Sequence, residues 1–157
     1  RVLSMVAKNC GGTVPTPGGF TTDDAALLDP AAALLGQVRD ALDRQAFHEA
    51  LEAVWTVIRA ANAYVDHQAP WKLRKEDPAR MATVLYVLSE TIRRLAILTQ
   101  PFMPETSAKL LDQLAVAADA RALDQLAPGV ALAPGTALPK PEGVFPRFQD
   151  DETQGAA

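Results

Sequence analysis

Apolar residues recur at steps of three and four along residues 46–69, and this spacing aligns them in one stripe on a helix. The helix is expected to end near Ala69, because Pro70 disfavours helical geometry in the residue before it. We expect the stripe to face the core, so that the Trp55 indole is buried. Its members are Phe47, Leu51, Val54, Trp55, Ile58, Ala61 and Val65.

A second periodic segment covers residues 78–100. Asp77 and Pro78 precede it as a cap and a first-turn proline, in the order that helices favour. Apolar side chains surround most of this helix, which predicts a central helix or one that another domain covers. The main stripe, with the residues that widen it, is Met81, Leu85, Leu88, Ile92, Leu95 and Leu98, then Val84, Tyr86, Val87 and Ile97.

Weaker patterns predict two helices before these segments. Residues 1–8 read as the end of a helix that stops at "NCGG", since Asn and Gly tolerate the left-handed conformation. Residues 25–44 form another, after capping candidates in "TTDD". Pro30 is expected to interrupt or restart that helix, with Asp29 as the new cap.

The C-terminal third loses its helical pattern in two steps. Two prolines, Pro101 and Pro104, end the central helix, and "PETSAKLLDQLAV" predicts a shorter one. "ADARALDQLA" adds one short turn. From Pro128 the chain is rich in Pro and Gly without periodicity, which is typical of an irregular tail.

These elements predict an all-α fold, a bundle of about four or five helices with short loops. Residues 1–127 form the expected helical domain and residues 128–157 the irregular tail, whose last residues are expected to be disordered. Within the tail, Val144, Phe145 and Phe148 offer an apolar anchor that can dock on the body of the protein or on a further domain.

Composition narrows the possible partners. The chain has 157 residues, 48% of them hydrophobic, and a net charge of −4, which argues against capture of nucleic acid over a broad basic surface. A single cysteine, Cys10, allows no internal disulfide and favours a reducing compartment. No apolar run reaches the roughly 18 residues of a membrane span. Because helix starts at the first residue without a cap, we interpret the chain as a segment of a longer protein.

Residues able to perform catalysis or bind metal are sparse. His48 and His67 lie several turns apart on one predicted helix, so they cannot share a metal through it, and "HEALE" lacks the second His of a zinc-protease motif. Cys10 follows Lys8 near a helix C-terminus, the wrong end to activate a thiolate. The two Gly-Gly pairs follow no strand. We therefore predict neither a catalytic residue nor a metal site in this segment.

One stretch, "QAPWKLRKEDPAR", is unusual because it is net positive in an acidic chain. A proline stiffens the start of the expected loop, and Trp71 stands beside several cations. An aromatic ring among cations suits single-stranded RNA, where the ring stacks on an unpaired base. Two other interpretations stay open: a Trp that plugs the bundle end with cations complementing a helix dipole, and a protein-docking site. The cations are Lys72, Arg74, Lys75 and Arg80.

The overlapping stretch "NAYVDHQAPWKLRKEDP" resembles the helix-end motif of the anticodon-binding domain of methionyl-tRNA synthetases, N-x-Y-x-x-x-x-x-P-W-x-L. The opening "RVLSMVAKNCGGTVP", the Pro-x-Met-Pro break in "TQPFMPETS" and "GVFPRF" are similar to segments of that family as well, so the resemblance covers residues 1–148. The matching motif residues are Asn62, Tyr64, Pro70, Trp71 and Leu73.

The resemblance implies a role for individual residues. Trp71 would stack on the first anticodon base, a cytosine, and Arg1 would contact the edge of that base. The Asn that partners this Arg in the family would lie four residues before Arg1, outside the chain. Asn62 and Tyr64 are expected to be structural, tying the helix end to its loop. Phosphates would be held without sequence preference by Lys8, Lys72, Arg74 and Lys75.

The resemblance also implies a whole protein: a cytoplasmic, bacterial methionine–tRNA ligase that uses ATP and Mg²⁺ on a catalytic domain outside this chain. A monomer is expected, of the type without an extra C-terminal dimerisation module. Its partners would be tRNA, through the methionine anticodon loop, and that catalytic domain. The alternatives are the equivalent bundle of another class I synthetase and a helical protein-interaction module with Trp71 as its hot spot.

Overall fold

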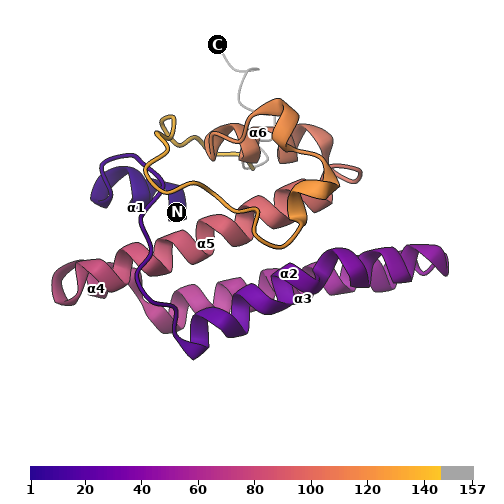
Figure 1. The fold of residues 1–157 in the computed structure, drawn as a ribbon, viewed down its shortest axis with the longest axis horizontal. Helices are drawn as coiled ribbons and strands as arrows, with labels where there is room; N and C mark the ends of the chain where they lie inside the picture. Colours follow the sequence, from indigo (N-terminus) through magenta and orange to yellow (C-terminus); the bar gives the residue numbers. More distant parts are fainter. Residues whose placement is uncertain (146–157) are drawn as a thin grey trace, which may run out of the picture.

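The computed structural model describes residues 1–145, so Phe148 and the predicted disorder of the last residues lie outside the described part. Helices dominate it, and its only β feature is an isolated bridge between Thr13 and Ala137, which confirms the all-α prediction. Figure 1 shows the arrangement. The helices are α1 (Val2–Asn9), α2 (Thr22–Asp43), α3 (Phe47–Gln68), α4 (Pro70–Glu76), α5 (Pro78–Thr99) and α6 (Pro104–Gln113), followed by the 3-10 turns η1 (Ala118–Ala120) and η2 (Leu123–Leu126).

Helices α2 and α3 form a long antiparallel hairpin (Figure 1). Thr21 and Asp24 close a capping box at the start of α2. The prediction that Pro30 interrupts this helix is wrong, because α2 runs unbroken through it. Pro30 is exposed, so water can satisfy the carbonyl that loses its N–H partner there.

The buried face of α3 differs from the predicted stripe. Its buried residues are mostly small, Ala50, Val54 and Val57, with Tyr64 near the end. Small side chains let two helices approach closely, and α3 packs more extensively on α2 than on any other element. Larger apolar residues of the predicted stripe lie on the exposed side instead, and the predicted burial of Trp55 is wrong. They are Phe47, Leu51 and Trp55, the last with 55% of its surface exposed.

Helix α5 is the centre of the fold, as its apolar girth predicts. It contacts α1, α2, α3, α4, α6 and η2, and most of its residues between Met81 and Thr99 are buried. The chain itself therefore covers this helix, and its girth is no sign of a covering domain.

A buried ion cluster attaches the C-terminal region to α5. Glu90 accepts hydrogen bonds from Arg93 and Arg94 and from the backbone N–H of Leu132, which lies 3.0 Å from Oε2. Arg93 in turn donates to the carbonyls of Gln125 and Val130. Residues on both sides of position 128 are thus held by one cluster, and the division of the chain at that position stays a prediction.

Candidate nucleic-acid interface

The corner between α3 and α4 consists of one residue, Ala69. It ends α3 and begins α4 in the left-handed conformation, with φ at 43°. Pro70 then occupies the first turn of α4 and is buried. The sequence predicted a loop here, and that prediction is wrong: a proline with its fixed φ starts the short helix Pro70–Glu76 instead.

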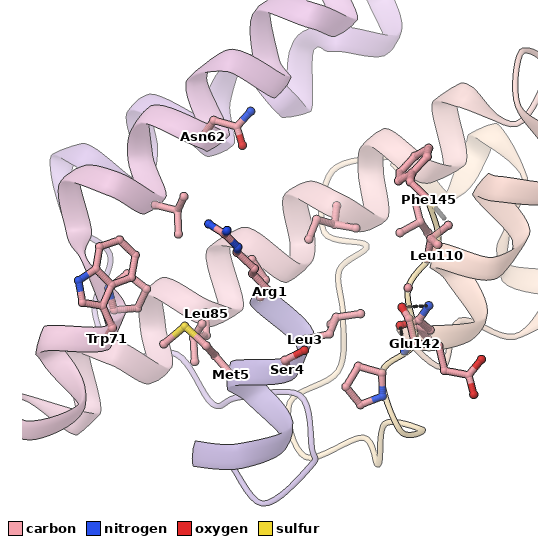
Figure 2. Close-up of a pocket in the computed structure, with 18 of the residues that line it drawn as sticks. Arg1, Leu3, Ser4, Met5, Asn62, Trp71, Leu85, Leu110, Glu142 and Phe145 are labelled. Atoms are coloured by element: carbon pink, nitrogen blue, oxygen red, sulfur yellow. Dashed lines mark hydrogen bonds between the residues drawn. The ribbon is translucent and has the colours of Figure 1, made fainter. Parts of the chain in front are cut away.

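Trp71 projects from the first turn of α4 with 50% of its surface exposed. It lines a pocket of about 610 Å³ between α1, α3, α4, α5, α6 and the segment near residue 145. Arg1 lines the same pocket and points toward α3, where Asn62 lies (Figure 2). Residues from three separate segments of the chain therefore meet around one hollow.

The predicted phosphate contacts lie outside this pocket. Lys72, Arg74 and Lys75 are exposed on α4, and within residues 1–145 none of them forms an ion pair. Helical spacing places Arg74 and Lys75 one turn from Trp71, on the same side of α4. Lys8 is exposed in the last turn of α1 and does not line the pocket.

Arg80, the fourth cation of the stretch, is engaged elsewhere. Its guanidinium donates to both oxygens of Asp24, at 2.6 Å and 2.8 Å. It also donates to Oε1 of Gln68 at 2.7 Å. The Arg80 guanidinium is therefore not available to bind a phosphate.

The two motif residues before the corner behave differently. Tyr64 is buried and its hydroxyl donates to Asp24, which ties α3 to α2. Asn62 is exposed and lines the pocket. The expectation of a structural role thus fits the contacts of Tyr64, whereas Asn62 faces the space beside Arg1.

Asp24 is the charged centre behind the corner. Burial alone would raise the pKa of its carboxyl group, but hydrogen bonds from Arg80, Tyr64 and the Thr21 N–H outweigh burial and hold the pKa well below its usual value. Burial and the neighbouring Asp24 raise the pKa of the Tyr64 hydroxyl, so it stays protonated. Sequence reasoning missed Asp24, since only its place in the "TTDD" cap set it apart.

The residues at the far end of the pocket were also not among the predicted site residues. Leu110 and Phe145 form an apolar wall there (Figure 2). Gln113 fixes the backbone of Glu142 by two hydrogen bonds, one from its Nε2 to the carbonyl at 3.1 Å and one from the Glu142 N–H at 3.0 Å. The predicted apolar anchor around Phe145 was the one signal in the sequence that pointed to this segment.

The remaining titratable groups form no second site in the part of the chain that the structure describes. His48 and His67 are exposed and lie near single carboxylates, Glu49 and Asp23. Burial raises the pKa of the Cys10 thiol. Over residues 1–145 no three metal-binding side chains gather, and no helix is long and apolar enough to cross a membrane.

Comparison with known proteins identifies the family. The family described as "Anticodon binding domain of methionyl tRNA ligase" matches residues 14–157. The chain belongs to this family. A methionine–tRNA ligase of Mesorhizobium japonicum is 53% identical over 148 residues, which are 94% of this chain and 29% of the relative. One of Mycobacterium leprae is 52% identical over 160 residues, 99% of this chain and 29% of the relative.

Solved structures agree with the family assignment. The free form of Mycobacterium tuberculosis methionyl-tRNA synthetase matches with a TM-score of 0.91 and 52% identity, over 96% of this chain and 31% of that one. The same enzyme in complex with methionyl-adenylate matches with a TM-score of 0.89 at the same identity, over 94% and 29%. This anticodon-binding domain therefore spans about three-tenths of the relatives it matches.

Proposed function

We propose that this domain binds the anticodon loop of a methionine tRNA, with Trp71 stacked on an unpaired base. The observation that carries the proposal is a half-exposed indole at the rim of a pocket that it shares with Arg1. A planar ring open to solvent is what an unstacked RNA base requires, and RNA recognition favours such splayed loop bases. Membership of the anticodon-binding family supports the same assignment.

Affinity and base choice would come from different groups. Stacking contributes about 1–3 kcal/mol for any base, because every base has a π-face. Arg1 lines the same pocket as the ring and can donate to the edge of the base, where a good bidentate contact discriminates by about 1–3 kcal/mol. Asn62 lines the same space and offers a second polar group to that edge.

The cations of α4 would hold the phosphates. Arg74 and Lys75 are exposed one turn beyond Trp71, and Lys72 is exposed beside it. Contacts to phosphate position the RNA but carry no sequence information. Lys8 at the end of α1 is a further candidate, at the edge of the surface.

For the whole protein we propose a methionine–tRNA ligase that activates methionine with ATP and Mg²⁺ on a separate catalytic domain. The relatives are named methionine–tRNA ligases, and one related enzyme was solved with methionyl-adenylate. We extend the proposal to a cytoplasmic monomer. Aminoacylation of tRNA by the full-length protein tests the activity, and analytical ultracentrifugation tests the oligomeric state.

The two tryptophans allow a matched test of stacking. Trp71 and Trp55 are exposed to nearly the same extent, 50% and 55%, but only Trp71 lines the pocket. In the full-length protein, Trp71→Ala should weaken binding of a methionine anticodon stem–loop by about 5-fold to 150-fold, the loss of one stacked base. Trp55→Ala should stay within about twofold. Binding is measured by fluorescence anisotropy of labelled RNA.

Two results would contradict the proposal. If Trp71→Ala binds the stem–loop as tightly as the parent protein, the indole does not stack on the RNA. If both variants lose affinity equally, the loss reflects general damage or a second surface on α3, and the pocket has no special role.

A further inference from the structure

The corner that presents Trp71 turns at a single strained residue. Ala69 carries the change of direction in a left-handed conformation, which costs a residue with a side chain about 1 kcal/mol or more. Its N–H donates to the Val65 carbonyl at 3.1 Å and its carbonyl accepts from the Lys72 N–H at 2.8 Å, but within residues 1–145 no side chain caps the start of α4. Side-chain contacts from outside the corner therefore add to these backbone bonds in fixing the direction in which Trp71 points.

Gln68, the last residue of α3, makes those contacts on two sides. Its Oε1 accepts a hydrogen bond from Arg80 on α5 at 2.7 Å, and its Nε2 donates to Asp23 on α2 at 2.8 Å. Gln68 precedes α4 and Arg80 follows it, so their hydrogen bond closes a loop that contains the whole of α4.

The partner of Gln68 is itself held by hydrogen bonds. Arg80 is clamped by both oxygens of Asp24. Asp24 is completely buried and is held in addition by the Thr21 N–H at 2.8 Å and by Tyr64. Gln68 thus connects the corner to a rigid, charged anchor that joins α2, α3 and α5.

We propose that Gln68 is a positioning residue for Trp71, which fixes the α3–α4 corner and so sets the angle at which the indole meets the base. This inference rests on the proposed stacking. Other contacts maintain the fold here: Pro70 is buried and Leu73 packs on the core. Loss of the Gln68 amide should therefore change the position of the ring without unfolding α4.

Gln100 provides the matched control. It lies at the opposite end of α5, is half-buried like Gln68, and also makes two hydrogen bonds, to the carbonyls of Ile97 at 2.9 Å and Arg121 at 2.7 Å. Gln100→Ala therefore removes the same chemical group and a similar number of bonds at a residue that does not line the pocket.

The experiment is a double-mutant cycle in the full-length protein, with anisotropy of a labelled methionine anticodon stem–loop. Gln68→Ala should weaken binding about threefold to tenfold, and Gln100→Ala less than twofold, at similar losses of thermal stability. Combined with Trp71→Ala, the Gln68 substitution should cause no further loss, because a positioning residue acts only through the ring.

Three results would overturn the inference while leaving the proposed stacking intact: normal binding by Gln68→Ala, equal losses for the two Gln variants, or losses at Gln68 and Trp71 that simply multiply. A Trp71→Ala variant that binds normally is a different failure, since it removes the proposed function together with the inference.

Discussion

Two buried carboxylates serve opposite regions of α5, and they hold different parts of the chain. Glu90 binds Arg93, Arg94 and the backbone of Leu132, so it fastens irregular chain to the helix. Asp24 binds Arg80 in the first turn of α5, beside the corner that carries Trp71. The same device, a carboxylate satisfied by guanidinium groups, supports tail packing in one region and a binding surface in the other.

The difference lies in what each cluster leaves exposed. Around Glu90, the carboxylate and Arg93 are buried, and the segment 125–132 that they bind is partly exposed but contains no aromatic or charged side chain. Around Asp24, the anchored corner ends in a half-exposed aromatic ring with exposed cations one turn away. A buried ion cluster of this kind therefore contributes to binding only where it orients an exposed side chain.

The strongest test of this comparison removes Glu90. Glu90→Ala leaves the buried Arg93 guanidinium without its partner, which should lower the free energy of unfolding by about 3–5 kcal/mol. Chemical denaturation followed by circular dichroism measures the change. Glu52→Ala, which breaks an exposed ion pair with Arg59, should cost at most about 1 kcal/mol. Equal losses of unfolding free energy in the two variants would show that the buried cluster stabilises the fold no more than an exposed ion pair does.

A smaller effect is expected when Asp24 is made neutral. Asp24→Asn keeps the shape but loses charge-assisted hydrogen bonds, a cost of about 1–3 kcal/mol at neutral pH. Because the folded-state pKa of Asp24 is lowered, its stabilising contribution is present above the unfolded pKa of about 3.9 and is lost as the pH falls toward the folded value.

The change of this stability difference with pH tests whether the Asp24 charge is responsible for it. The difference in free energy of unfolding between the parent protein and Asp24→Asn should shrink as the pH falls from about 5 toward 2. Denaturation curves at several pH values measure it. A difference that stays constant over this range would mean that the Asp24 charge contributes nothing to the stability.

The smallest effect concerns the cations on α4. Lys75→Ala should weaken stem–loop binding by about 0.3–1 kcal/mol and reduce the salt dependence by roughly 0.7 in the logarithmic slope, the value for one phosphate of a single strand. Titrations at several salt concentrations measure both. Arg39→Ala on the exposed face of α2 is the control with an unchanged slope. An identical slope in the two variants would exclude Lys75 from the RNA contact.

The sequence predicted the helices well because their ends carry local signals. Asp77 caps α5 through the Arg80 N–H, and Thr21 with Asp24 caps α2, as residues of those types do in isolation. It failed where tertiary contacts decide the outcome. Whether the Ala50 side or the Trp55 side of α3 is buried depends on how closely α2 approaches, which periodicity does not encode.

The site was predictable in part for the same reason. The unusual local composition singled out Trp71 beside Arg74 and Lys75, although the helix that Pro70 begins was predicted as a loop. The network from Gln68 through Arg80 to Asp24 joins residues up to 56 positions apart, and nothing local marks it. Gln113, which places the far wall of the pocket, is equally ordinary in sequence.

The pair of hydrogen bonds between Gln113 and Glu142 has a practical consequence for anyone labelling this protein. It brings the main chain to Phe145, which lines the pocket, so a dye or affinity tag attached at position 145 would stand at the wall of the hollow and compete with RNA for space. The turn between α2 and α3, at Gln45, lies at the other end of α3 and offers an attachment point outside the pocket lining.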